Sequence, residues 1–217
     1  MRKNLIEVIK QEKLIVIVRG IAREKLIPLT EAMYNGGVRL LEVTYNASGL
    51  ISDEETAENI RMLCDHFGEK MYIGAGTVLT ETQVDLTQKA GGCFIISPNT
   101  KQNIIGKTRE LGMVSIPGAF SPSEVVAAHE CGADFVKLFP VTNLGFEYVK
   151  AIKAPLSHIE LLAVGGIDLN NISSYKKAGV SGFGIGSNIT DKRMIANEDW
   201  QGITALANQY IQVIQEE

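Results

Sequence analysis

Long apolar runs, clustered cysteines and clustered histidines are all missing from this chain of 217 residues. No stretch approaches the roughly 18 consecutive apolar residues that a membrane-spanning helix needs. Residues 1–7 interrupt their apolar side chains with charges and carry no small-residue cleavage site, unlike a secretory signal peptide. These absences predict a cytoplasmic protein with no membrane partner.

The three cysteines, Cys64, Cys93 and Cys131, are odd in number, far apart and without a CxxC pair. This pattern predicts buried thiols in a reducing compartment rather than a disulfide framework or a zinc site. The three histidines are equally dispersed, so we expect no bound metal. Lys and Arg are scattered over a chain of net charge −4, which disfavours a nucleic-acid partner.

Short apolar runs alternate with helical patterns along the whole chain. The predicted strands are 14–18, 39–44, 71–74, 94–96, 114–116, 134–138, 159–163 and 182–185. The predicted helices are 22–35, 53–66, 80–90, 101–111, 121–131, 145–152, 170–178 and 199–215. This alternation implies a parallel sheet with right-handed crossovers. We therefore predict one domain over residues 1–217, an α/β single-domain (β/α)8 TIM barrel; periodicity alone leaves an open doubly wound sheet as the rival.

Lys137 stands inside an apolar run, residues 133–140, that otherwise reads as a buried strand. Side-chain alternation puts Phe135, Lys137 and Phe139 on one face. If that face points inward, burial lowers the pKa of the amine and makes it a nucleophile near neutral pH. A lysine at a strand end can equally extend its ammonium group to solvent, and spacing does not separate the two cases.

Glu42 is a second charged residue within an apolar run, residues 40–44. Leu40, Glu42 and Thr44 share a face, so a partly buried carboxyl with a raised pKa could act as general acid and base. The alternative is a structural ion pair with Arg19 or Arg39.

Two glycine turns follow the last two predicted strands, Gly165-Gly166 and Gly184-Ile185-Gly186-Ser187. Adjacent turns without side chains expose backbone N–H groups that can hold a phosphate, and barrels often bind phosphate at these two loops. Tight turns at a barrel rim need glycine for conformational reasons as well. Gly182 to Gly186 and Gly74 to Gly76 approach a dinucleotide fingerprint, but neither completes it, so we discount nucleotide binding.

Together these segments resemble the 2-keto-3-deoxy-6-phosphogluconate (KDPG) and 4-hydroxy-2-oxoglutarate (KHG) aldolase family, from about residue 13 to residue 189. The motifs that carry the resemblance are Ile15 to Arg19, Gly36 to Thr44, Gly74 to Leu79, Ile96 to Pro98, Ile116 to Gly118, Val136 to Pro140 and Gly165 to Ile167. The resemblance implies a cofactor-free class I aldolase, a carbon–carbon lyase that releases pyruvate and an aldehyde, and a homotrimer.

By resemblance, Lys137 matches the lysine that forms the Schiff base and Glu42 matches the general acid and base. The matches to substrate-binding positions are Arg19, Thr77, Pro98 and Phe139. The matches to phosphate-binding positions are Gly165, Gly166, Gly186 and Ser187.

The chain departs from the family pattern at Asn46, where an Arg is usual, and at Ala163-Val164, where Pro-Thr is usual. Loss of a bidentate partner should weaken binding of a carboxylate. We therefore expect Schiff-base chemistry with an altered substrate preference. A phosphate-binding barrel isomerase or epimerase, a non-catalytic binding protein and a metal-dependent aldolase are the alternatives.

Overall fold

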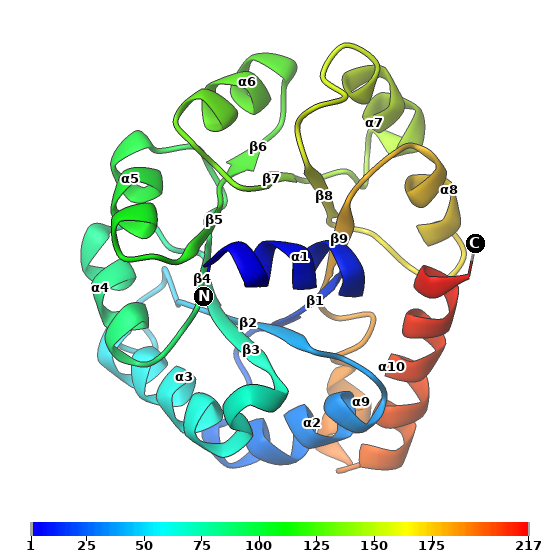
Figure 1. The fold of residues 1–217 in the computed structure, drawn as a ribbon. Helices are drawn as coiled ribbons and strands as arrows, with labels where there is room; N and C mark the ends of the chain where they lie inside the picture. The colour runs from blue at the N-terminus through cyan, green and yellow to red at the C-terminus, as the bar shows by residue number, and fades with distance from the viewer. Residues whose placement is uncertain (1, 217) are drawn as a thin grey trace.

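The computed structural model describes residues 2–216, which form a ring of parallel strands surrounded by helices (Figure 1). The strands are β1 (Leu14–Val18), β2 (Leu40–Thr44), β3 (Tyr72–Gly76), β4 (Phe94–Ile96), β5 (Val114–Ile116), β6 (Gly118–Ala119), β7 (Val136–Leu138), β8 (Leu161–Val164) and β9 (Gly182–Ile185). Their order is β5-β4-β3-β2-β1-β9-β8-β7-β6, so the sheet begins and ends on two segments that are neighbours in the chain.

Segments β5 and β6 act as one barrel strand that is interrupted at Pro117. On the side that faces β4, the Ser97 N–H donates to the Ile116 carbonyl at 3.2 Å. On the other side, the Lys137 N–H donates to the Pro117 carbonyl at 2.8 Å. The segment therefore closes the sheet into the predicted barrel of eight strands, and the open-sheet alternative is wrong.

The outer layer consists of helices that pack against the strands (Figure 1). Its helices are α2 (Arg23–Asn35), α3 (Asp53–Phe67), the short 3₁₀ helix η1 (Gly68–Lys70), α4 (Glu81–Lys89), α5 (Gln102–Glu110), α6 (Pro122–Glu130), α7 (Gly145–Lys153), α8 (Ile172–Lys177), α9 (Lys192–Ala196) and α10 (Trp200–Gln215). Of these, η1 and α9 were not predicted. In residues 2–216 no helix combines the length and the apolar character required to cross a bilayer.

Local chemistry explains where the helices begin and end. At the start of α6, the Ser121 side chain accepts from the Glu124 N–H while the Glu124 carboxylate accepts from the Ser121 N–H, which is a capping box. After α4, Gly91 adopts a φ of +90°, a conformation that glycine reaches without a Cβ clash. Such signals place the predicted boundaries within about two residues of the observed ones.

The first helix, α1 (Arg2–Glu12), was also not predicted, and it lies across the amino-terminal end of the barrel (Figure 1). Leu5 and Ile9 are one helical turn apart and fully buried, and they join the apolar cluster inside the barrel. This i, i+4 pair was the available signal for the helix. Helix α1 therefore fills the amino-terminal end of the barrel with apolar side chains.

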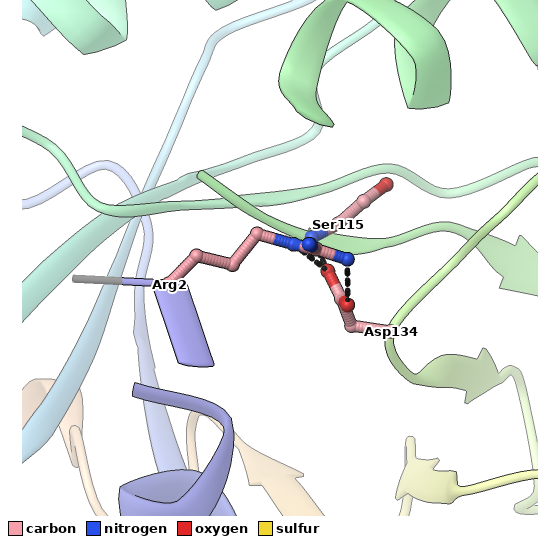
Figure 2. A network of polar contacts seen from close by, with 3 residues as sticks. All are labelled: Arg2, Ser115 and Asp134. Atoms are coloured by element: carbon pink, nitrogen blue, oxygen red, sulfur yellow. Dashed lines mark hydrogen bonds and ion pairs between the residues drawn. The ribbon is translucent and has the colours of Figure 1, made fainter. Parts of the chain in front are cut away.

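An ionic contact fixes α1 to the barrel (Figure 2). The Arg2 guanidinium binds the Asp134 carboxylate through two nitrogens, with Nε to Oδ2 at 3.1 Å. Oδ2 of Asp134 also accepts from the Ser115 backbone N–H at 3.0 Å. Asp134 therefore connects α1 and β5 to the segment that leads into β7. Its side chain is only 5% exposed.

Replacing Arg2 with Ala should lower the free energy of unfolding by about 1–3 kcal/mol, because Asp134 then keeps a buried charge with fewer hydrogen bonds. Urea denaturation measures the change. The control is Arg193→Ala, which removes a solvent-exposed partner of Asp191 and should change nothing measurable. Equal effects of the two substitutions would contradict a structural role for the Arg2–Asp134 pair.

Candidate active site

Lys137 points into the carboxyl-terminal end of the barrel from β7. It alternates with Phe135, which belongs to the apolar interior cluster, and its own side chain is only 5% exposed. Its Nζ lies 4.8 Å from the centre of the Phe139 ring. Burial lowers the pKa of the amine; the charge of Glu42 opposes this shift and that of Arg19 adds to it. A lowered pKa increases the neutral, nucleophilic fraction of the amine near neutral pH.

Glu42 reaches the same interior from β2 and is 1% exposed. Its Oε1 has no hydrogen-bond partner among the described residues. Burial raises the pKa of this carboxyl, while the charges of Lys137 and Arg19 lower it. A buried carboxyl with a free oxygen and a raised pKa is suited to exchanging protons with a bound molecule.

Gly76 at the end of β3 provides the space for that carboxyl. Its strand pairs with β2, with Thr44 opposite Gly76. A Cβ built on Gly76 would lie 1.7 Å from Oε1 of Glu42, closer than any real contact. The residue at position 76 must therefore lack a side chain if Glu42 is to keep its position.

A cavity of about 390 Å³ opens at the carboxyl ends of β1, β7, β8 and β9. Seven of the predicted site residues line it, namely Arg19, Lys137, Phe139, Gly165, Gly166, Gly186 and Ser187. Val164 adds an apolar wall that is 6% exposed. The lining residues that the sequence did not indicate include Ile17, Ile21, Asn188, Thr190 and Lys192.

Three predicted site residues do not line this cavity. Glu42 is buried beside it and acts electrostatically on Lys137. Thr77 is connected through Arg19, whose Nη2 donates to the Thr77 hydroxyl at 3.4 Å. Pro98 is half-buried and packs its carbonyl against Gly118, where a Cβ would lie 2.3 Å from the Pro98 oxygen.

The two glycine turns lie side by side and are tied together. Gly165 and Gly166 have φ values of +98° and +73°, which glycine adopts without strain. Nδ2 of Asn188, on the loop after β9, donates to the Ile167 carbonyl on the loop after β8 at 2.7 Å. Nδ2 of Asn171 fixes the same turn through the Gly166 carbonyl at 2.8 Å. These two hydrogen bonds hold the backbone of both turns in place at the rim of the cavity.

Asn46 takes no part in the lining of the cavity. Its Oδ1 accepts from the Ser48 N–H at 2.9 Å, which closes a turn within the loop after β2. The side chain that replaces the family's usual Arg is thus used locally.

The pH at which Lys137 becomes reactive should be lower than for lysines whose pKa is raised. Lys10 and Lys107 provide internal controls, because a hydrogen bond to Glu160 raises the pKa of the first and one to Asp85 raises that of the second. Acetic anhydride labelling, followed by mass spectrometry across a pH series, measures all three. We expect the Lys137 rate to reach its plateau first; a plateau together with the controls would contradict a lowered pKa.

Replacing Gly76 with Ala should lower the free energy of unfolding by about 1–3 kcal/mol, because the new methyl overlaps the Glu42 carboxylate. The control is Gly106→Ala, where nothing lies within 4 Å of the added methyl. In the Glu42→Ala background the penalty of Gly76→Ala should largely disappear, which urea denaturation of the double-mutant cycle measures. An unchanged penalty would show that the methyl meets something other than Glu42.

The model of the family described as KDPG and KHG aldolase matches residues 5–206. The chain is 32% identical to a 2-dehydro-3-deoxy-6-phosphogalactonate aldolase of Escherichia coli, over 93% of this chain and 96% of that one. It is also 32% identical to a 2-dehydro-3-deoxy-phosphogluconate aldolase of Treponema pallidum, over 97% and 98% of the two chains. The crystal structure of the KDPG aldolase of Legionella pneumophila superposes with a TM-score of 0.81 at 28% identity, over 94% and 96% of the chains. That structure holds pyruvate as a covalent carbinolamine intermediate.

Proposed function

Because the chain belongs to the KDPG and KHG aldolase family, and is therefore a class I carbon–carbon lyase, we propose that it cleaves a 2-keto-3-deoxy-6-phosphohexonate to pyruvate and glyceraldehyde 3-phosphate through a Schiff base on Lys137. The observation that carries this assignment is the buried Lys137 amine, held in the same barrel interior as the Glu42 carboxyl.

The first step is attack of the neutral Lys137 amine on the C2 ketone of the substrate. The carbinolamine that forms takes a proton from the Glu42 carboxyl and loses its hydroxyl group as water, which leaves an iminium ion and the Glu42 carboxylate. The positive nitrogen then accepts the electron pair of the C3–C4 bond. Burial of Lys137 supports the initial attack, because it lowers the pKa of the amine and so raises its uncharged fraction.

Bond cleavage requires removal of the proton from the C4 hydroxyl, and we assign this to the Glu42 carboxylate. The aldehyde departs, and the enamine of pyruvate stays attached to Lys137. Glu42 returns the proton to C3, and hydrolysis of the iminium releases pyruvate and the amine. One carboxyl can serve these transfers because they occur at neighbouring atoms, and the unpartnered Oε1 supports this role.

The two ends of the substrate would be held by different parts of the site. Arg19 and Thr77 would orient the carboxylate end, next to Lys137. The backbone N–H groups around Gly165, Gly166, Gly186 and Ser187 would hold the phosphate. Pro98 and Phe139 stay predictions as substrate contacts.

The named relatives act on hexonates that differ in configuration at C4, and we propose the galactonate epimer as the preferred substrate. Two relatives at 32% and 34% identity carry the phosphogalactonate name. The family pattern usually has Thr where this chain has Val164. The apolar Val164 side chain in the cavity lining therefore supports a substrate preference that differs from the one associated with Thr. We also propose a homotrimer, a cytoplasmic location and activity on 4-hydroxy-2-oxoglutarate. Light scattering tests the homotrimer.

Lys137→Ala should abolish pyruvate release from both epimers, and Glu42→Gln should reduce kcat by at least about 100-fold. A lactate dehydrogenase-coupled assay measures pyruvate directly. Cys131→Ala, a substitution remote from the cavity, is the matched control and should behave as the wild type. Turnover near the wild-type rate in Lys137→Ala would exclude the covalent mechanism, and faster cleavage of the gluconate epimer would exclude the proposed preference.

A further inference from the structure

Three basic side chains line the cavity, Arg19, Lys137 and Lys192, and none of its described lining residues is Asp or Glu. Arg19 is exposed, and its Nη2 donates to the Thr77 hydroxyl at 3.4 Å. Arg19 follows β1 directly, whereas Lys192 begins α9, so the two side chains reach the cavity from different segments.

Lys192 forms no ion pair within residues 2–216, even though an acid precedes it in the chain. The Asp191 carboxylate is occupied: Oδ1 accepts from the Arg193 N–H at 2.8 Å and from the Met194 N–H at 3.1 Å. The other oxygen lies 3.8 Å from the Arg193 guanidinium. Lys192 is exposed and lines the cavity, so its ammonium group is free to bind an anion there.

The loop that carries Lys192 is fixed beside the glycine turns. The Gly186 carbonyl accepts from the Ile189 N–H and the Thr190 N–H, both at 2.9 Å. Asn188 in the same loop is bonded to the Ile167 carbonyl at 2.7 Å. Lys192 thus starts from an anchored backbone a few residues beyond Ser187, at the edge where backbone N–H groups are available.

We propose that Lys192 binds the terminal phosphate group of the substrate and determines the preference for phosphorylated over unphosphorylated 2-keto-3-deoxy acids. This inference rests on the proposed function. Backbone N–H groups supply hydrogen bonds without net charge, whereas a phosphate monoester brings close to two negative charges at neutral pH. An ammonium group on a flexible stem supplies the missing charge and adapts to the phosphate oxygens.

The test compares Lys192→Met with the neighbouring control Arg193→Met, whose parent side chain is 91% exposed and outside the cavity lining. For the phosphorylated substrate, Lys192→Met should raise KM about five- to tenfold and leave kcat unchanged, since a charge at the rim affects binding more than chemistry. For the unphosphorylated analogue, KM should not change. Lys192→Arg should recover most of the affinity, and added salt should weaken phosphorylated-substrate binding less in Lys192→Met than in the wild type.

An equal change in KM for both substrates, or no change for either, would overturn the role of Lys192. Binding of sn-glycerol 3-phosphate, measured by calorimetry, tests the same contact without turnover. Weaker binding in Lys192→Met than in Arg193→Met supports the proposal even if neither sugar acid is cleaved, an outcome that would reject only the proposed function. Equal binding of sn-glycerol 3-phosphate by the two variants would overturn the role of Lys192.

Discussion

The burial of the Lys137 amine inside the barrel is the constraint on which the rest of the site depends. Removal of the ammonium group from water disfavours its charged form, and Glu42, buried in the same interior, is pushed in the opposite direction. Both shifts move the groups toward states in which they can exchange protons near neutral pH. A buried carboxyl oxygen without a hydrogen-bond partner among the described residues costs stability, which is consistent with the proton-transfer role proposed for Glu42.

The barrel accommodates these two groups by filling one end and leaving space at the other. At the amino-terminal end, α1 inserts Leu5 and Ile9 into the interior cluster. At the carboxyl end, glycine takes the place of larger inward residues: Gly76 clears space for Glu42, and a Cβ on Gly184 would lie 2.8 Å from the Val164 side chain. The same interior is therefore packed with apolar side chains toward the amino-terminal end and holds the candidate active site at the carboxyl end.

The sequence predicted the barrel because its two periodicities were regular, with capping residues and glycine at the helix boundaries. It also predicted which residues of β2 and β7 share a face, since alternation groups them once the strand is known, but it left open whether the Lys137 face points inward. It did not predict α1, because charged residues interrupt the apolar ones in this segment. The sequence did not indicate Lys192, because its position depends on how the loop after β9 folds against the loop after β8. Pro98 and Thr77 are not among the residues that line the cavity, which also depends on how the loops fold.

Trapping of the Schiff base shows whether Lys137 is the residue that binds pyruvate covalently. The protein is incubated with pyruvate and sodium borohydride, its intact mass is recorded, and the adduct is located by peptide mapping. We expect one reduced pyruvyl adduct per chain on Lys137, and Glu42→Gln should still form it. An adduct on another lysine, or none at all, would exclude Lys137 as the residue that forms the Schiff base.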